Sequence, residues 1–448
     1  MKKNSALRSS FSRVPVLISF ALLCSVSALA ATITVTNTND SGPGSLRQAL
    51  ADATDGDTIN FSVSGIIRLT SDQLTVNANI VIDGPGANML TVDGDERGRV
   101  FYISSGKTVS ISGLTITRGK AGLVDGLRFG GGIFNDHSTL TVSDCALRRN
   151  SADSGGGGIF NDGRGGGTVT LSIANSTLDG NETRGNIGGG ILNSGRAQGK
   201  ATLSITNSTL NANSARLAGG GIYNDGAIDG TAMLTVRNST LSFNEAQSFG
   251  GGIYNDGNTT GRATLLINNS TLSRNVAIYG GCAGILNDHA ALMVSNCTLS
   301  GNSAIARRGV GILNKEATLQ IGDTILNAEA SDTNILNDRG KITSLGYNLT
   351  SDNGGGVLTG AGDQINTDPM LGPLQDNGGP TVTHAPLTGS PAIDMGDPNF
   401  TPPPDYDQRG SGYSRVVNSR LDIGAIEVQA PTRPTPTPRP EPTPAPRP

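Results

Sequence analysis

The chain has 448 residues, of which 63 are glycine and none is tryptophan, and only 16% are charged. This composition is unusual for compact α/β or helical domains and favours a repetitive, β-rich architecture. The formal net charge of −4, without a basic arm or stripe, disfavours nucleic-acid binding.

Residues 1–30 have the pattern of a secretory signal peptide. Four basic residues precede the apolar run VLISFALLCSVSALA, which ends in the small-residue pattern Ala-Leu-Ala at residues 28–30. The run is shorter than the ~20 residues needed to span a bilayer, so we expect cleavage and no transmembrane segment in the mature chain. The sequence therefore predicts an exported, bacterial-type protein that is secreted or held at the cell surface or outer membrane.

A recurring unit dominates the middle of the chain. Its marker is an Ile followed two residues later by an Asn, as in FGGGIYNDG at residues 249–257, and successive markers are 23 to 32 residues apart. The isoleucines are Ile133, Ile159, Ile191, Ile222, Ile253, Ile285, Ile312 and Ile335. The asparagines are Asn135, Asn161, Asn193, Asn224, Asn255, Asn287, Asn314 and Asn337. A period of this length indicates a solenoid, a propeller or another array.

Between the markers lies a segment that alternates apolar and polar residues, such as VTLSIANSTLDGN and ATLSITNSTLNAN. Alternation with period two predicts β-strands. Length variation is confined to one corner after the Asn-Asp-Gly, where four units carry an insertion at residues 163–167, 195–199, 226–230 and 257–261. A parallel β-solenoid with two or three short strands per coil accommodates this pattern better than a propeller or a leucine-rich repeat.

In a parallel solenoid each residue stacks on its equivalent one coil away, at the interstrand spacing of ~4.8 Å. The repeated Ile and Leu positions are therefore predicted to fill the interior. The repeated Asn positions are predicted to form a structural ladder, in which each side-chain amide bonds to the amides above and below. The loops that carry the insertions are a candidate recognition edge, or a corner that merely tolerates insertion.

Three cysteines follow residue 30, namely Cys145, Cys282 and Cys297. This number is too small and too odd for a disulfide framework. One bridge between Cys282 and Cys297 is compatible with the sequence, and so is burial of all three as small apolar side chains.

The GGGI and Leu-x-x-Asn repeats resemble those of the polymorphic outer-membrane proteins and, more broadly, the right-handed parallel β-helix of pectin-lyase-like proteins. The resemblance covers roughly residues 60–350, and we assign the β-helix to residues 63–350. It implies an all-β fold, a right-handed, single-stranded parallel β-helix. This fold hosts lyases, hydrolases, adhesins and tail spikes, so it does not by itself imply a function.

Two flanking segments extend the resemblance. Residues 31–62 resemble the N-terminal module named for its Cys-Ser-Leu-Arg-Glu-Ala motif (CSLREA), which reads Gly-Ser-Leu-Arg-Gln-Ala at residues 44–49. We expect this segment to form a strand and a short helix that cap the first coil. Residues 351–429 contain LGPLQDNGGPTVTHAPLTGSPAIDMG, DQRG and DIGAIE and resemble the C-terminal region of choice-of-anchor (type Q) surface proteins. The proline-rich residues 430–448 predict a disordered, extended tail.

One column of carboxylates is a candidate metal site. Asp225, Asp256 and Asp288 each follow a ladder Asn and fall on three successive coils. Carboxylates ~5 Å apart repel one another unless they are hydrated or bridged by a cation, so Ca²⁺ is the candidate cofactor. The alternative interpretation is an ordinary Asn-Asp-Gly turn whose exposed Asp is solvated. No other cofactor is expected.

The C-terminal region holds the densest group of polar residues. Its members are His384, Asp394, Asp407, Arg409, Asp422 and Glu427. Two interpretations remain: a ligand or ion site, and a hydrogen-bonded cap that closes the last coil, of which we favour the cap. We assign no catalytic residue, since no nucleophile motif accompanies the three histidines.

These observations predict a monomeric, non-catalytic adhesion or interaction scaffold with an extracellular glycan or protein as its ligand and no nucleic-acid partner. The alternative is a carbohydrate-active enzyme of the same fold, either a polysaccharide lyase or a glycoside hydrolase. A cleft with converging carboxylates and an Arg or Lys would favour the enzyme. A smooth solenoid with one decorated edge would favour the scaffold.

Overall fold

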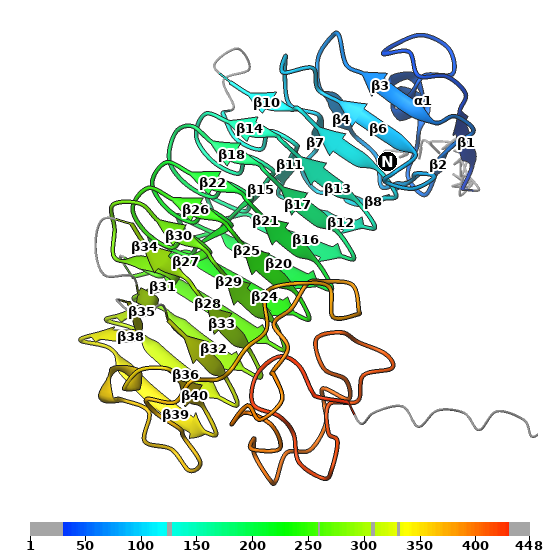
Figure 1. Ribbon diagram of the computed structural model, residues 1–448. Coiled ribbons are helices and arrows are strands. Elements are labelled where there is room, and N and C mark those ends of the chain that lie inside the picture. The colour runs from blue at the N-terminus through cyan, green and yellow to red at the C-terminus, as the bar shows by residue number, and fades with distance from the viewer. Residues whose placement is uncertain (1–29, 123–127, 259, 306–309, 329–331, 430–448) are drawn as a thin grey trace, which may run out of the picture.

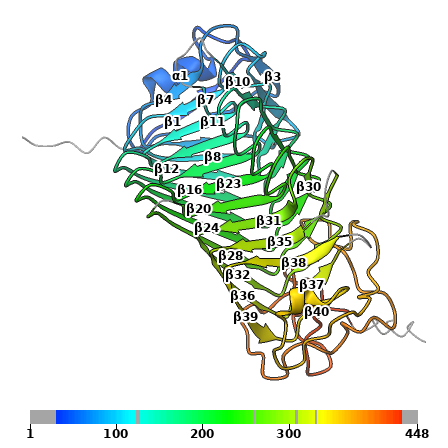
Figure 2. The ribbon, with the colours of Figure 1, turned by 90° about the vertical axis from the view of Figure 1, so that its left-hand side faces the viewer.

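The computed structural model describes residues 30–122, 128–258, 260–305, 310–328 and 332–429. The predicted signal peptide, apart from residue 30, and the proline-rich tail lie outside these ranges. The described chain is a parallel β-solenoid in which successive coils stack along one axis (Figures 1 and 2). Every pair of named strands is parallel, as the sequence predicted. No described helix is long and apolar enough to cross a membrane.

Four sheets run along the solenoid, one strand per coil in each. The 12-stranded sheet consists of β1 (Thr32–Val35), β2 (Thr58–Phe61), β5 (Val81–Asp83), β8 (Thr108–Ser112), β12 (Thr139–Ser143), β16 (Thr168–Ala174), β20 (Lys200–Thr206), β24 (Thr231–Arg237), β28 (Arg262–Asn268), β32 (Ala291–Ser295), β36 (Thr318–Gly322) and β39 (Lys341–Gly346).

The 11-stranded sheet follows in each coil. It consists of β3 (Gly65–Arg68), β6 (Leu90–Asp93), β9 (Thr115–Thr117), β13 (Ala146–Arg148), β17 (Thr177–Asp179), β21 (Thr209–Asn211), β25 (Thr240–Ser242), β29 (Thr271–Ser273), β33 (Thr298–Ser300), β37 (Ile325–Asn327) and β40 (Leu349–Thr350).

The 10-stranded sheet carries the Ile-x-Asn marker. It consists of β4 (Leu74–Val76), β7 (Phe101–Ile103), β11 (Ile133–Asp136), β15 (Ile159–Asp162), β19 (Ile191–Ser194), β23 (Ile222–Asp225), β27 (Ile253–Asp256), β31 (Cys282–Asp288), β35 (Val310–Lys315) and β38 (Thr333–Asp338). A narrow 7-stranded sheet of two-residue strands completes the coils with β10 (Lys120–Ala121), β14 (Ser151–Ala152), β18 (Glu182–Thr183), β22 (Ser214–Ala215), β26 (Glu245–Ala246), β30 (Val276–Ala277) and β34 (Ser303–Ala304).

The register between coils is the one that the repeat predicts. Ile133 pairs with Ile159, and each later marker Ile pairs with the next, to Ile335. These isoleucines are at most 1% exposed and share one continuous core with the repeated leucines. A slip of one residue would turn every buried side chain outward, so burial of one face holds the register.

The N-terminal segment covers the open end of the core. Helix α1 (Leu46–Asp52) begins at the N-cap Ser45, whose hydroxyl accepts a hydrogen bond from the amide of Gln48. Leu46 and Leu50 are buried in the solenoid core, so the helix shields the first coil from solvent. The 12-stranded sheet already begins with β1, which pairs with β2 inside the segment 31–62.

The far end of the core is closed by a short stretch that includes the 3₁₀ helix η2 (Gly354–Gly356). Leu358 is buried in the core and Val357 packs against it. The cap hypothesis expected the C-terminal polar residues to close the last coil, but the rest of the C-terminal region does not close it. Residues 366–429, called here the C-terminal module, lie along the outside of the lower coils (Figure 1). Direct hydrogen bonds join this module to β25 and β29, more than 100 residues earlier in the chain.

The three cysteines of the described chain are free and buried. Cys282 and Cys297 therefore form no bridge with each other. Burial raises the pKa of each thiol to about 12, which makes them poor nucleophiles at neutral pH.

Candidate functional site

The marker asparagines form a continuous hydrogen-bonded ladder inside the solenoid. The side-chain amide nitrogen of Asn135 donates to the side-chain oxygen of Asn161, and the same bond recurs at each step to Asn337, at 2.7 to 3.0 Å. A second ladder joins Asn150, Asn181, Asn213, Asn244, Asn275 and Asn302. Both ladders lie in the interior, and within each ladder every side-chain amide bonds to the next rung. They are therefore structural elements that present no surface to a ligand.

The carboxylate column lies at a buried corner. Asp225, Asp256 and Asp288 are 3–5% exposed, so the expectation of an exposed, solvated turn Asp is wrong. Aromatic side chains explain the burial, since the Tyr223 and Tyr254 rings cover the outside of the 10-stranded sheet with centroids 4.7 Å apart. Each hydroxyl reaches one coil forward, from Tyr223 to Asp256 at 2.7 Å and from Tyr254 to Asp288 at 3.0 Å.

Each carboxylate of the column has its own protein donors. Asp225 accepts from the Ser194 hydroxyl and the Ala227 amide, and burial raises its pKa to about 6. Asp288 also accepts from Lys315 Nζ at 3.1 Å and contacts His289 Nδ1 at 2.7 Å. These partners take the place that a bridging cation would fill, so the chemistry of the donors favours a structural corner over a Ca²⁺ site.

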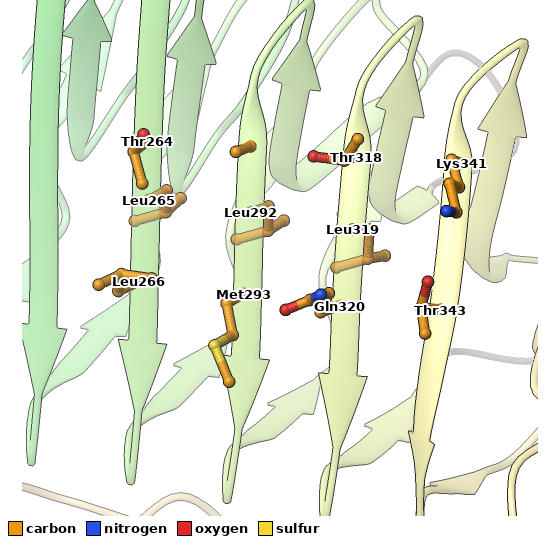
Figure 3. A pocket seen from close by; sticks show the side chains of 11 residues that line it. Thr264, Leu265, Leu266, Leu292, Met293, Thr318, Leu319, Gln320, Lys341 and Thr343 are labelled. Atoms are coloured by element: carbon orange, nitrogen blue, oxygen red, sulfur yellow. The ribbon is translucent and has the colours of Figure 1, made fainter.

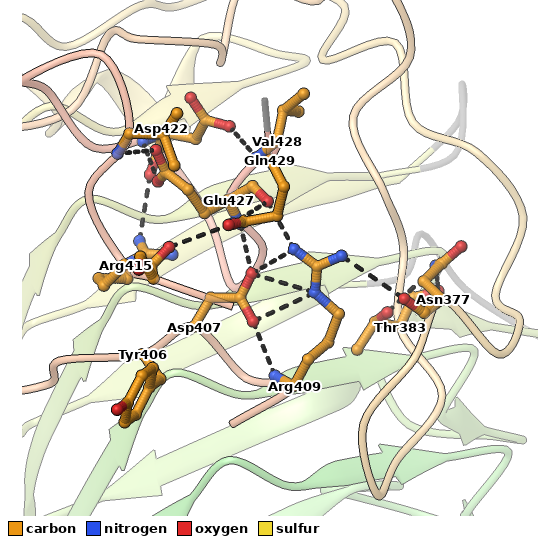
Figure 4. Close-up of polar contacts among 12 residues, drawn as sticks. Asn377, Thr383, Tyr406, Asp407, Arg409, Arg415, Asp422, Glu427, Val428 and Gln429 are labelled. Atoms are coloured by element: carbon orange, nitrogen blue, oxygen red, sulfur yellow. Dashed lines mark hydrogen bonds and ion pairs between the residues drawn. The ribbon is translucent and has the colours of Figure 1, made fainter. Parts of the chain in front are cut away.

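The C-terminal polar residues form three groups, of which the second and third are joined, because the Glu427 amide donates to Asp407 and Arg409 donates to the Glu427 carbonyl (Figure 4). His384 lies apart from the others, because its ring nitrogens contact the Ser273 hydroxyl at 2.9 Å and the Gly372 carbonyl at 2.7 Å. Asp407 and Arg409 form a bidentate ion pair (Figure 4).

Asp394, Asp422 and Glu427 form the third group. One oxygen from each lies within 4.8 Å of the others, which is compatible with a metal ion. Both oxygens of Glu427 accept from the backbone amides of Val417 and Asp422. Both oxygens of Asp422 accept from the amides of Asp394 and Val428. This amide set, rather than a ligand, organises the turn, and burial raises the pKa of Glu427 to about 8.

Two buried residues of the module escaped the sequence-based assignment. Arg415 is fully buried, and its pKa is lowered by burial although four carboxylates lie nearby. Gln408 is also fully buried and binds Thr240 and Thr271 of the solenoid. The DQRG sequence contains Gln408, but no pattern in the sequence indicated that a glutamine would contact strands 137 and 168 residues away.

The outer face of the 12-stranded sheet is one surface that is open to a ligand. Two hollows meet there and share Leu266 and Met293. The first has a volume of about 340 Å³ and crosses β28, β32, β36 and β39, with Gln320, Lys341 and Thr343 among its lining (Figure 3). The second has a volume of about 530 Å³, crosses β20 to β32, and is bounded by Pro403 and Pro404 of the C-terminal module. We call the two hollows together the groove.

The charged residues on the strands that form the groove are all basic. The nine strands of this sheet from β8 to β39 contain no Asp, Glu or His. Lys200, Arg237, Arg262 and Lys341 lie on these strands, are exposed, and form no ion pair with any described residue. Within an acidic protein, this sheet presents a positive face.

The groove also lacks the groups that an acid–base mechanism at paired carboxylates requires. Its described lining consists of Thr, Ser, Asn and Gln side chains, apolar side chains, Arg237 and Lys341. Hydroxyl and amide groups suit hydrogen bonding to an extended polar chain, and Leu266 with Met293 supplies an apolar strip in the floor. The residues assigned from the sequence all lie elsewhere in the molecule.

No family model and no curated protein matches the chain by sequence. Among solved structures, the pectate lyase Pel9A is 15% identical over 89% of this chain and 97% of its own, with a TM-score of 0.49. An alginate lyase from Paenibacillus sp. is 15% identical over 69% of this chain and 99% of its own, with a TM-score of 0.46. A rhamnogalacturonan lyase is 11% identical over 81% and 96%, with a TM-score of 0.41. These TM-scores are all below 0.5, so the likenesses carry no argument about this chain, and its parallel β-solenoid rests on its own strand pairing.

Proposed function

We propose that this protein is an exported, monomeric binding scaffold that holds an acidic extracellular glycan along the groove of the 12-stranded sheet. Export follows from the signal-like residues 1–30, and attachment as a surface protein of the polymorphic outer-membrane or choice-of-anchor type belongs to the same proposal. The solenoid supplies a long, stiff platform on which each strand presents equivalent positions to a linear ligand.

The single observation that carries the proposal is the composition of the groove. Its floor offers hydroxyl groups and an apolar strip, and Lys200, Arg237, Arg262 and Lys341 surround it without any carboxylate on the same strands. Opposite charge steers and orients a polyanion, and this attraction is screened by salt. The affinity for an acidic polymer is therefore expected to fall as ionic strength rises.

A polysaccharide lyase is the second candidate, because Lys341 lies unpaired in the first hollow. A lyase needs a base that takes a proton from the sugar and a group that stabilises the resulting charge. Lys341 is the groove residue that could take one of these roles, whereas Arg237 lies four strands away at ~4.8 Å per strand, too far to act on the same sugar. A glycoside hydrolase has less support, since it requires a pair of carboxyl groups about 5 to 9.5 Å apart at the bond that is cleaved.

The test uses the purified protein with polygalacturonate, alginate and neutral xylan. Calorimetry measures binding, while the ultraviolet absorbance of unsaturated sugar products and a reducing-end assay measure turnover. The variant Arg237→Gln/Arg262→Gln/Lys341→Gln is expected to lose binding to the acidic polymers by about tenfold or more, since each removed charge contributes a fraction of a kcal/mol to 1 kcal/mol.

The matched control is Arg148→Gln/Arg149→Gln, which removes two exposed charges at a corner away from the groove. It should retain parental affinity. Equal binding by both variants would contradict the groove as the site, and absence of binding to all three polymers would contradict the glycan proposal. Turnover that disappears with Lys341→Gln alone would replace the scaffold by the lyase.

A further inference from the structure

The C-terminal module is attached to the solenoid through a specific polar lock centred on Gln408. Its side-chain nitrogen donates to the Thr240 hydroxyl at 2.8 Å and to the Ser239 carbonyl at 3.2 Å. Its side-chain oxygen accepts from the Thr271 hydroxyl at 2.6 Å. One glutamine thus joins two consecutive coils, and the Thr240 hydroxyl in turn donates to the Val382 carbonyl of the module.

Further contacts place the module along four coils. His384 meets Ser273 of β29, and the amide of Ala425 donates to the Thr298 hydroxyl of β33 at 3.1 Å. The amide of Asp397 donates to Asp323, which follows β36, at 2.8 Å. Apart from Asp323, these contacts share one feature, because hydroxyls of the 11-stranded sheet bind groups from the module.

The apolar part of this attachment is small. Ile325 and Leu349 of the solenoid meet Ala392 and Ile423 of the module in a cluster that is separate from the main core. The main core contains no residue of the module, since its members all lie between Val35 and Leu358. An attachment that is mostly polar and contributes nothing to the main core can open without unfolding the solenoid.

The same module forms one wall of the groove. Pro403 and Pro404 line the second hollow together with Arg237, Asn268 and Ser295. Pro403 is exposed, so its ring is available to a ligand. The floor of the groove belongs to the solenoid, whereas this wall comes from a loop about 110 residues further along the chain than Ser295.

We propose that the C-terminal module is a detachable wall of the groove, which Gln408 holds in place. This wall decides how wide a ligand can lie across β24, β28 and β32. Its effect on ligand choice rests on the proposed function, since it presumes that the ligand occupies the groove. The detachment of the module from the solenoid does not rest on the proposed function. Docked, the proline loop confines the second hollow; undocked, the outer face of the sheet is open on that side.

The experiment measures how fast thiol reagents label cysteines placed in the groove, in the absence of any ligand. Ser295→Cys places a thiol in the second hollow, which Pro403 and Pro404 also line, and Thr343→Cys places a thiol in the first hollow, whose lining includes no residue of the module. The three cysteines of the described chain are at most 3% exposed, and the parent protein provides the background rate. Labelling is followed with a small methanethiosulfonate reagent and with a bulky polyethylene glycol maleimide.

Adding Gln408→Ala to Ser295→Cys should raise the rate of bulky labelling by about tenfold, the change expected when buried hydrogen-bonding groups lose their partner. The Thr343→Cys rate should not change. Because Gln408→Ala could disturb folding, far-UV circular dichroism must show an intact solenoid. Pro403→Gly/Pro404→Gly provides a second route, since these changes alter the wall and leave the lock in place.

Unchanged bulky labelling of Ser295→Cys in both backgrounds would overturn the detachable wall. So would loss of the solenoid spectrum together with the module, because the module would then be part of the fold. Polygalacturonate and alginate add a separate arm. If either binds the parent and the proline variant equally, the wall plays no part in ligand choice. If neither binds while labelling responds, the proposed function fails and the wall stands.

Discussion

The Asn ladder gives the sharpest quantitative prediction, because each rung has defined partners. Asn224 is 0% exposed, accepts from the Asn193 amide at 2.7 Å and donates to the Asn255 oxygen at 2.8 Å. Replacement by Ala leaves one buried donor and one buried acceptor without this partner. Each such group costs about 1–3 kcal/mol, so Asn224→Ala should lower the free energy of unfolding by about 2–6 kcal/mol.

The end of the ladder supplies an internal comparison. Asn337 is only half-buried, accepts from Asn314 at 3.0 Å and donates to the nearby Gly340 carbonyl instead of to another rung. Asn337→Ala therefore breaks one rung and should cost about 1–3 kcal/mol. Thr202→Ala, on the exposed face of β20, should stay within about 0.5 kcal/mol of the parent.

Denaturant unfolding followed by far-UV circular dichroism is the assay, because the chain has no tryptophan for fluorescence. Hydrogen exchange of the amides in β23 and β27 reports the local effect. A loss at Asn224 below about 1 kcal/mol, or no larger than the loss at Asn337, would refute the idea that buried amides are satisfied along the axis.

Three further predictions concern charge, pH and packing. Burial disfavours the ionised form of Asp288, but hydrogen bonds from His289 and Lys315 outweigh this effect and lower the pKa of Asp288. The ionised carboxylate therefore stabilises the fold at neutral pH, and this stabilisation is lost in acid. Asp288→Asn should flatten the fall of the melting temperature below pH 4, and a fall as steep as that of the parent protein would contradict this. Burial lowers the pKa of His384, so docking of the module should weaken as the pH falls below about 6.5, and His384→Gln should remove that dependence in hydrogen exchange. Gly221→Ala would place a methyl group 2.6 Å from the Gly252 carbonyl and should cost more than about 2 kcal/mol, whereas Gly98→Ala, with no neighbour within 4 Å, should be nearly neutral in the same unfolding assay.

The repeated part of the fold could be read from the sequence because its contacts are between nearest neighbours. An Ile or Asn that recurs every 23 to 32 residues pairs with its own equivalent, so the alignment of the repeats is also the register of the sheets. The strands, the buried Ile columns and the corner that accepts insertions follow from this one-dimensional arrangement.

The burial of the carboxylate column could not be read in the same way. Asp-Gly after Asn is a common turn signal, and the sequence does not reveal that Tyr223 from the preceding coil covers Asp256. Burial there depends on the aromatic column outside the 10-stranded sheet, which combines side chains from several coils. Local turn chemistry predicted the bend correctly but not its environment.

The amino-acid sequence by itself determined the solenoid, its coil length and its inter-coil register, because every coil meets a near copy of itself and local periodicity is enough to specify such contacts. Only the tertiary structure decided where the C-terminal module docks, that His384 is separate from Glu427, and that Pro403 and Arg237 line the same hollow. The module has no repeat to pair with, so its position is set by the sum of polar and apolar contacts between segments more than 100 residues apart. Such contacts have no periodic signature in the sequence, and the groove that they complete becomes visible only when the chain is folded.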